Sequence, residues 1–187
     1  DIPCQHHPVP DNASSHGCGW PSAFSVPIPE EWSSGYYEFT MEIADDGGTY
    51  EQRCARSAQA TGYFVLRPGA DQPRAKMLLG LSTNTYAAYN NWGGFSLYAY
   101  HGRGGVQGNR VSFQRPDRGL FSRWEAPFVQ WIEENGYALD YCTNLDLEHH
   151  PDLLDQYPLL LSVGHDEYWS APMRDRVEAF IGRGGNC

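Results

Sequence analysis

The sequence predicts an α/β fold in which a small antiparallel β module precedes a parallel sheet with flanking helices. Three short apolar runs, expected to be buried strands, lie at residues 76–81, 137–142 and 159–163. Helical patterns alternate with them at residues 124–135, at 145–156 and after Ser170. This order is typical of a parallel sheet with right-handed crossovers. We assign residues 1–70 to an irregular lead-in and the β module, and residues 71–187 to an α/β domain of catalytic type, expected to be truncated at its C-terminal end.

The β module is expected from a period-two alternation that begins near Tyr36. The apolar positions of this alternation are Tyr37, Phe39, Met41 and Ile43. Such a pattern predicts a half-buried strand with Tyr37 on its inner face. A turn at residues 45–48 and a second strand at residues 62–67 complete the module. The proline-rich stretch at residues 2–29 predicts loops with at most one edge strand.

The stretch from Tyr157 to Gly185 combines a strand, a polar cluster and a helix. Residues 159–163 form a continuous apolar run, expected to be a central parallel strand covered on both faces. Ser170 is positioned to cap the following helix. The apolar helical positions are Met173, Val177, Phe180 and Ile181, and Gly182, Gly184 and Gly185 are expected to end the helix.

A polar cluster comes directly after this strand. Its members are His165, Asp166, Glu167, Tyr168 and Trp169. In open α/β sheets, ligands bind beyond the carboxyl ends of the strands, so this place favours a chemical site. The alternative is a polar strand-to-helix loop with Trp169 as a packing residue. Neither Gly-x-Ser-x-Gly nor Gly-x-Cys-x-Gly occurs here, which favours acid/base or metal chemistry over a serine triad.

A second concentration of reactive groups follows the strand at residues 76–81. Residues 82–94 are dense in hydroxyl, amide and aromatic side chains, although the same composition fits a loop with half-buried aromatic anchors. Two polar clusters at strand ends can face one crevice.

The glycine-rich stretch at residues 101–109 matches neither a phosphate-binding loop nor a dinucleotide fingerprint, and we expect a flexible loop. Trp92, Trp124 and Trp131 are interpreted as packing residues, with Trp92 also a candidate pocket wall.

Composition limits the class of partner. The 187-residue chain has a formal net charge of −10 and a single lysine, Lys76, so nucleic acid and anionic membranes are not expected partners.

Five cysteines without paired short spacing leave the redox compartment open, and a cytoplasmic location is favoured. A group of Cys4, His6, His7, His16 and Cys18 suggests at most adventitious metal binding. A start at Asp1 and an end after a glycine-rich turn suggest a processed or truncated chain.

Four segments resemble the large (beta) subunit of the N,N-dimethylformamidase family. They are TNTYAAYNNWGGFSLY (83–98), VSFQRP (111–116), WEAPFVQWIEENGYALDYCTNLDL (124–147) and SVGHDEYWSAPMRDRVEAFIGRGGN (162–186). The HDEYW motif is the most specific part, and the upstream SGYY and YFVLRP resemble the strands of the family's β module. The resemblance implies a glutamine amidotransferase-like α/β domain without a cysteine nucleophile, which agrees with the missing Gly-x-Cys-x-Gly motif.

The resemblance also implies a site. In that family a mononuclear iron, expected as Fe(III), is held by two tyrosines and one glutamate and hydrolyses dimethylformamide to an amine and a carboxylic acid. Glu167 matches the glutamate, Tyr89 or its alternative Tyr86 matches one tyrosine, and Tyr37 matches the other. His165 resembles a histidine near the metal. The predicted catalytic residues are His165, Glu167 and Asp166, and the predicted substrate-binding residues are Asn90, Trp92 and Tyr168.

This ligand set is chemically reasonable. Phenolate and carboxylate are hard anionic oxygen donors that suit Fe(III). Three protein ligands leave open positions for water and an amide carbonyl. His165 can exchange a proton with the attacking water or the leaving amine, and Asp166 either orients that histidine or caps the helix. The resemblance implies a small amide as substrate, a small companion subunit and a homo-oligomer.

Two other functions are compatible with the sequence. A noncatalytic binding or assembly module would keep the fold with an incomplete site, and Glu167 would then fail to converge with two tyrosines. A metal-free hydrolase would use His165 and Asp166 with a hydroxyl such as Ser162. The second alternative is weaker because Ser162 is expected to lie within the strand.

Overall fold

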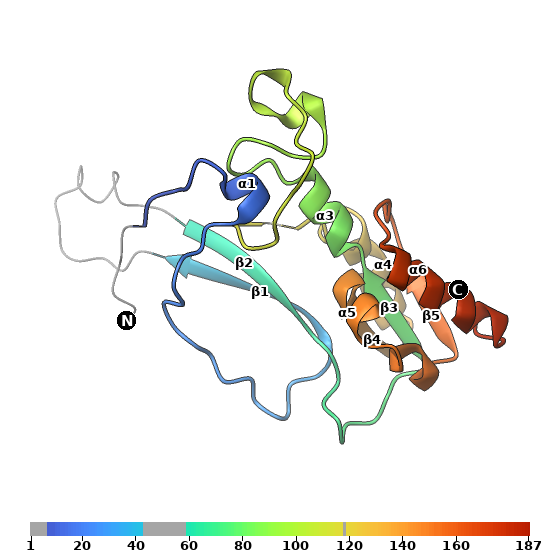
Figure 1. The fold of residues 1–187 in the computed structure, drawn as a ribbon. Helices are drawn as coiled ribbons and strands as arrows, with labels where there is room; N and C mark the ends of the chain where they lie inside the picture. Colours follow the sequence, from blue (N-terminus) through green and yellow to red (C-terminus); the bar gives the residue numbers. More distant parts are fainter. Residues whose placement is uncertain (1–6, 43–58, 118) are drawn as a thin grey trace.

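The computed structural model describes residues 7–42, 59–117 and 119–187 and contains two separate sheets (Figure 1). Strands β1 (Gly35–Glu42) and β2 (Gln59–Leu66) form an antiparallel ribbon. Strands β3 (Met77–Leu81), β4 (Leu139–Thr143) and β5 (Leu159–Ser162) form a parallel sheet in the order β4-β3-β5. The predicted α/β class, with an antiparallel pair before a parallel sheet, is confirmed.

Helices connect the parallel strands. The α-helices are α1 (Ala13–His16), α3 (Thr83–Tyr89), α4 (Glu125–Glu134), α5 (Asn144–His149) and α6 (Ala171–Gly182), and the 3₁₀ turns are η1 (Ala99–His101), η2 (Arg103–Gly105) and η3 (Leu153–Gln156). The predicted helices at residues 124–135 and 145–156 correspond to α4 and to α5 with η3. None of the helices in the described ranges is long and apolar enough to cross a membrane.

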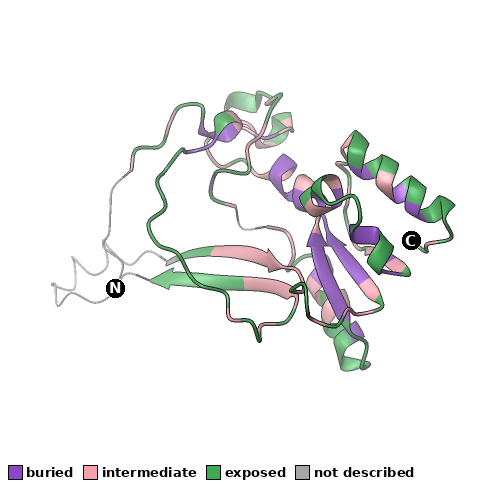
Figure 2. Cartoon of the chain, turned by 60° about the horizontal axis from the view of Figure 1, so that its bottom comes forward, coloured by how far each residue is buried: buried purple, intermediate pink, exposed green. Residues whose placement is uncertain are grey.

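Strand β3 is the centre of the hydrophobic core (Figure 2). Successive side chains of a strand point to opposite faces, and Leu78 and Leu79 are both fully buried in different clusters. Leu78 packs with residues of α5, η3 and α6, whereas Leu79 packs with Ile132 of α4. Because both faces are covered, the strand reads as a continuous apolar run in the sequence.

The expectation that residues 159–163 form a central strand was wrong in the described sheet. Strand β5 lies at the sheet's edge, and of its residues only Leu160 is buried. Asn186 makes an isolated parallel bridge with Leu159, and Leu160 N–H donates to the carbonyl of Asn186 at 2.9 Å. The apolar run therefore belongs to an edge strand that is buried at Leu160 and forms a short bridge with Asn186.

Two helices differ from their sequence-based description. Residues 83–89 form helix α3 rather than a loop, and its inner face includes the buried Thr85 and Tyr86. Local tertiary packing overrides the weak helix propensity of the threonines and asparagine there. In α6 the Ser170 cap is confirmed, since its hydroxyl accepts from Met173 N–H at 3.3 Å. Ile181, expected on the apolar face, is 50% exposed.

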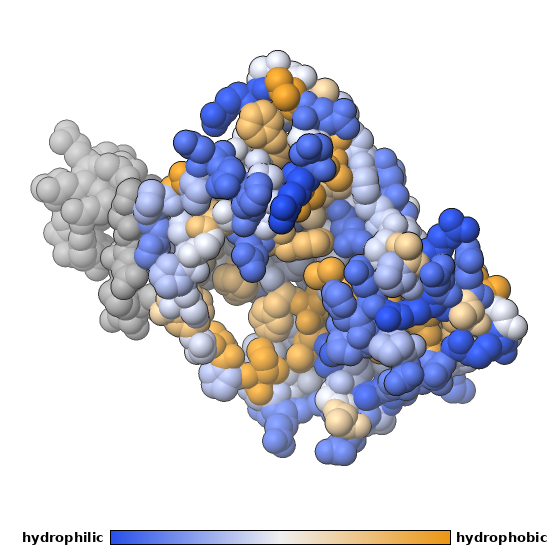
Figure 3. Space-filling model, viewed as in Figure 1, coloured by the Kyte–Doolittle hydropathy of each residue, from blue (hydrophilic) through white to orange (hydrophobic). Residues whose placement is uncertain are grey.

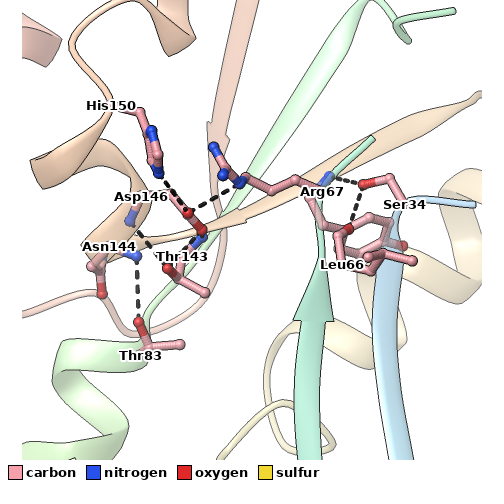
Figure 4. A network of polar contacts seen from close by, with 9 residues as sticks. Ser34, Leu66, Arg67, Thr83, Thr143, Asn144, Asp146 and His150 are labelled. Carbon is pink, nitrogen blue, oxygen red and sulfur yellow. Dashed lines mark hydrogen bonds and ion pairs between the residues drawn. The ribbon is translucent and has the colours of Figure 1, made fainter. Parts of the chain in front are cut away.

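The ribbon is joined to the parallel sheet by polar contacts near Leu66 (Figure 4). The Ser34 hydroxyl donates to the carbonyl of Leu66 and accepts from the N–H of Tyr141, both at 2.8 Å. Arg67 pairs with Asp146 at 3.1 Å, and Asp146 also completes the capping box of α5 with Thr143. These contacts fix one end of the ribbon against β4.

The other end of β1 is less covered than the alternation predicted. Phe39 and Met41 are 39% and 41% exposed. The predicted turn at residues 45–48, and Ile43, lie outside the described residues. Before β1, the described residues 7–29 contain the short helix α1 and no strand. Figure 3 shows apolar surface beside the opening between this N-terminal segment and the ribbon.

A buried amide joins the carboxyl ends of all three parallel strands. Asn144, which follows β4 and is 1% exposed, accepts from the N–H of Asn84 at 2.9 Å after β3. Its side-chain amide also points toward Asp166 after β5, at 3.5 Å, and its N–H donates to the Thr83 hydroxyl at 3.3 Å. Asp166 in turn accepts from Ser162 at 3.0 Å. The three strand ends therefore share one polar network.

We predict that Asn144→Ala destabilises the protein by about 1–3 kcal/mol, because the part-buried N–H of Asn84 loses its acceptor and the buried amide network is removed. The measurement is the free energy of unfolding from urea titration. Asn135→Ala, which removes an exposed amide at the end of α4, is the matched control and should change this free energy by less than about 1 kcal/mol. Equal effects of the two substitutions would contradict the role of the network.

Candidate functional site

Four side chains meet beyond the carboxyl ends of β3 and β5. The Glu167 carboxylate accepts from the Tyr98 hydroxyl at 2.6 Å and from the Tyr89 hydroxyl at 3.0 Å, one on each carboxylate oxygen. His165 Nε2 lies 2.6 Å from the oxygen that Tyr89 contacts, and 3.1 Å from the Tyr89 hydroxyl. The cluster thus joins the HDEYW motif to two tyrosines near α3.

The turn after β5 directs Glu167 toward α3. Gly164 has φ = 82°, and a Cβ at this position would lie 2.5 Å from the Cβ of Trp124, so a larger residue would not fit. The N–H of Glu167 donates to the buried Thr85 hydroxyl at 2.9 Å. The Asn84 amide donates to the carbonyl of Tyr168 at 3.0 Å. Two consecutive residues of the turn are therefore held by α3.

The two tyrosines come together through a reversal of the chain. Tyr89 is the last residue of α3, and the N–H of Leu97 donates back to the carbonyl of Ala88 at 3.0 Å. Gly93 lies in this reversal with φ = 84°, and a Cβ there would lie 2.8 Å from the N atom of Ser14 in α1. The rings of Tyr89 and Tyr98 consequently pack with centroids 4.2 Å apart.

A buried guanidinium occupies the inside of this reversal. Arg115 is 6% exposed and donates to the carbonyls of Trp92 at 2.6 Å, Phe95 at 3.3 Å and Ala87 at 3.1 Å. A fourth hydrogen bond reaches the carbonyl of Ser112 at 2.9 Å. The guanidinium has a planar set of five donors, which suits a fan of carbonyl acceptors. Arg115 therefore ties together the segment that separates Tyr89 from Tyr98.

The electrostatics favour an ionised Glu167 beside protonated phenols. The hydrogen bond from Tyr98, followed by those from Tyr89 and His165, holds the pKa of Glu167 below its ordinary value. Desolvation and the bond to Glu167 raise the pKa of Tyr98. The pKa of Tyr89 is also raised: its hydrogen bond with Tyr98 lowers it, but desolvation and Glu167 outweigh that effect. Any cation bound here would replace the two phenolic protons.

The structure places the two other predicted tyrosines elsewhere. Tyr37 donates to the carbonyl of Ser33 at 2.7 Å and stacks on Trp32 and Phe64, with ring centroids 4.8 and 5.2 Å apart. Tyr86, which is 1% exposed, donates a short hydrogen bond to the buried carboxyl of Glu125. Of the predicted tyrosines, the structure therefore brings Tyr89 to Glu167, and it engages Tyr37 and Tyr86 in other contacts.

Asp166 supports the turn rather than contacting the histidine ring through a hydrogen bond. Its carboxylate accepts from Ser162 and Asn144. Burial raises the pKa of Asp166, and these hydrogen bonds lower it in part. Because Ser162 bonds Asp166 directly, the order serine–histidine–aspartate of a hydrolytic triad is not formed. Trp169 caps the same turn, with its indole N–H donating to the carbonyl of Asp166 at 3.2 Å.

The predicted substrate-binding residues have different positions. Asn90 and Trp92 line a pocket of about 970 Å³ into which Tyr89 and His165 also project. Asn90 donates to the carbonyl of Pro116 at 2.9 Å, so part of its side chain is used structurally. Tyr168 instead packs edge-on against Tyr98, with ring centroids 6.3 Å apart, and borders a different, smaller cavity.

Sequence reasoning missed Tyr98 and His101. Tyr98 lies at the end of the segment TNTYAAYNNWGGFSLY, and the pair Gly93 and Gly94 within it signals a chain reversal between Tyr89 and Tyr98 without specifying which side chains the reversal brings together. His101, one turn later, packs edge-on against Tyr89 with ring centroids 6.0 Å apart and lines the pocket. The expectation of a loop at residues 101–109 overlooked this contact.

The donor set fits a hard metal ion. In the described ranges, no group of three His, Cys, Asp or Glu side chains could hold a metal ion, so a metal here would need the phenol oxygens. Ligands about 2.0 Å from a metal and at right angles lie about 2.8 Å from one another. The hydroxyls of Tyr98 and Tyr89 lie 2.6 and 3.0 Å from the Glu167 carboxylate oxygens. Both the spacing and the three oxygen donors are compatible with such an ion.

Comparison with protein families identifies the chain. Residues 2–187 match the family described as "N,N-dimethylformamidase beta subunit-like, C-terminal". The chain belongs to this family. The match includes both halves of the site, the segment with Tyr89 and Tyr98 and the HDEYW motif, and it confirms the resemblance noted from the sequence.

Two curated relatives support the assignment. The chain is 27% identical over 214 residues to the N,N-dimethylformamidase beta subunit of Paracoccus aminophilus, and 25% identical over 214 residues to that of Alcaligenes sp.. Each alignment covers 90% of this chain and 26% of the relative. The chain thus spans about a quarter of the length of these relatives.

We predict that Arg115→Lys lowers the free energy of unfolding by about 2–4 kcal/mol, because one ammonium cannot reach carbonyls spread from Ala87 to Ser112 and leaves some of them unpaired. Urea titration measures this change. Arg110→Lys, at an exposed position two residues before Ser112, is the control and should be nearly neutral. If Arg115→Lys is as stable as the wild type, Arg115 does not hold this segment together through its hydrogen bonds.

We predict a pH-dependent effect at Glu125, whose pKa is raised by burial although the Tyr86 hydrogen bond lowers it in part. Since the folded state holds this proton more tightly than the unfolded state, stability decreases as pH rises from about 4.3 through the raised pKa, by at most about 1.4 kcal/mol per pH unit. Glu125→Gln should remove this part of the slope in urea titrations at several pH values. Glu134→Gln, at an exposed position of α4, should keep it.

Proposed function

We propose that this chain carries the active site of a metal-dependent amidohydrolase that cleaves a linear amide into an amine and a carboxylic acid. The observation that carries the proposal is the convergence on Glu167 of two tyrosine hydroxyls, with His165 on the same carboxylate. The site lies at the carboxyl ends of parallel strands, and two of its four residues, Tyr89 and His165, line a pocket, a place where ligands bind in α/β folds. The names of the family and of its relatives support the same reaction class.

Tyr89, Tyr98 and Glu167 are the proposed ligands of a mononuclear iron, as Fe(III). This assignment keeps the two-tyrosine, one-glutamate set implied by the family resemblance but takes Tyr98 in place of Tyr37. Three anionic oxygen donors neutralise most of the charge of Fe(III). A bound ion would supply Lewis acidity, which polarises the amide carbonyl and lowers the pKa of water.

His165 is the proposed proton carrier. Its Nε2 lies at the edge of the pocket, within 2.6 Å of Glu167, and its side chain is 45% exposed. In hydrolysis, a water oxygen adds to the carbonyl carbon and its proton passes to a base. The C–N bond then breaks, and the amine nitrogen takes up a proton. Nε2 is placed to accept the first proton and to return it to the leaving amine.

Two alternatives have less support. A binding module with an incomplete site does not require two hydroxyls and a histidine around one carboxylate. A metal-free hydrolase would need Ser162 to reach His165, but the Ser162 hydroxyl donates to Asp166 at 3.0 Å.

The relatives are named as beta subunits, which supports a companion subunit for the active form.

We predict that the protein binds iron near stoichiometrically and shows a phenolate-to-iron absorption band in the visible range. Tyr89→Phe, Tyr98→Phe and Glu167→Gln should each weaken iron binding by at least about 100-fold and diminish the band, because each removes one anionic ligand. Metal analysis after dialysis and visible spectra measure both effects.

Tyr37→Phe and Tyr86→Phe are the matched controls, and both should keep iron and colour. If Tyr37→Phe loses the band while Tyr98→Phe keeps it, the ligand assignment is wrong. A folded protein that takes up no iron and cleaves no amide would instead favour the binding module.

A further inference from the structure

The pocket beside the candidate site is much larger than dimethylformamide requires. Its volume is about 970 Å³, near the upper end of the range of about 300–1,000 Å³ found for sites that hold drug-sized ligands. Tyr89 and His165 line it, and so do Ala60 and Thr61 of β2. A substrate whose amide group lies at His165 can therefore extend a sizeable group toward the β ribbon.

The wall next to His165 is an indole ring. Trp124 lines the pocket, is 40% exposed, and its ring centroid lies 6.4 Å from that of His165. It is held against the turn of the HDEYW motif, because the Cα of Gly164 has no room for a side chain beside the Trp124 Cβ. The position of this indole is thus coupled to the turn that carries the candidate catalytic groups.

A second indole and a cation extend the same surface. Trp92 lines the pocket and is supported from behind by Trp20, whose ring meets it edge-on at 5.8 Å. The Arg123 guanidinium lies over Trp124, 5.2 Å from the ring centroid. Large planar rings bind planar groups by stacking or edge contacts at low entropic cost. The pocket also contains Asp117, so its charges do not select a strongly charged substrate.

We propose that the natural substrate is an amide that carries an aromatic group, and that Trp124 is a specificity-determining residue that packs against that group. The inference rests on the proposed function for the reaction itself, which is unchanged: water adds to the carbonyl carbon, the C–N bond breaks, and the amine nitrogen gains the proton. The pocket adds the substrate class. The aromatic ring occupies the space between Trp124 and Trp92 while the amide lies at His165.

The test compares dimethylformamide with two amides in which a phenyl group replaces one substituent. N,N-dimethylbenzamide places the ring on the acyl side, and N-methylformanilide places it on the nitrogen. Binding is measured by isothermal titration calorimetry on the iron-loaded protein, and hydrolysis by release of the amine. At least one aromatic amide should bind at least about 10-fold more tightly than dimethylformamide, a ratio that corresponds to about 1.4 kcal/mol.

Substitutions locate the effect. Trp124→Ala should weaken binding of the aromatic amide by about 10-fold while changing dimethylformamide binding by less than about 2-fold, and Trp124→Phe should recover most of the loss. Trp131→Ala is the control, because Trp131 is 56% exposed on α4 and does not line the pocket. Equal losses for all three amides in Trp124→Ala would overturn the specificity role.

The two proposals fail in different ways. Tight, Trp124-dependent binding of an aromatic amide without hydrolysis of any amide would refute the proposed reaction and retain the aromatic pocket. Hydrolysis of dimethylformamide with no preference for either aromatic amide would retain the reaction and refute the substrate class.

Discussion

The site depends on one buried side chain, Asn144, that contains no reactive group. A fully buried amide needs hydrogen-bond partners within the protein, and here its oxygen accepts from Asn84 after β3 while its nitrogen points toward Asp166 after β5. That requirement fixes where α3 starts relative to the turn after β5. Because Tyr89 lies on α3 and Glu167 lies on the turn, the meeting of hydroxyl and carboxylate is a consequence of sheet geometry. In a parallel sheet the carboxyl ends of all strands lie at the same edge, and side chains that follow the strands therefore gather there.

The second constraint is a buried guanidinium that is held by carbonyl oxygens. Arg115 is buried against the carbonyl oxygens of Ala87 in the last turn of α3 and of Trp92 and Phe95 in the connection that follows, so these carbonyls receive a donor from its side chain. The hydrogen bonds of Arg115 order a long connection, and they do so although removing the guanidinium from water costs free energy. The pairing of Tyr89 with Tyr98 results from that order, since their rings meet only when the loop between them is closed.

Sequence patterns predicted what local periodicity determines. Strands β3 and β4 and helix α4 were found because a buried run and a 3.6-residue repeat leave clear signals. Helix α3 was missed because its threonines and asparagine are typical of a loop, and the contacts of Thr83 and Asn84 with Asn144 leave no local signal in the sequence. Glu167 and His165 were proposed from the HDEYW motif and its place after a strand, and Tyr89, with Tyr86 as its alternative, from the family resemblance; their role stays a prediction. Tyr98 was not, because its approach to Glu167 depends on a loop closed by the distant Arg115, and no local pattern records that contact.

The β ribbon is attached to the parallel sheet along only part of its length in the described residues. Ser34 and Arg67 hold it near Leu66, and Tyr63 rests edge-on against Tyr86. Thr61 and Ala60 lie beyond Tyr63, about 7 and about 10 Å further along the strand at roughly 3.3 Å per residue, and they line the same pocket as His165. The pocket is therefore lined by two separate parts of the chain, the β ribbon on one hand and the end of α3 with the turn after β5 on the other, so that a shift of the ribbon relative to the parallel sheet would change the shape of the pocket.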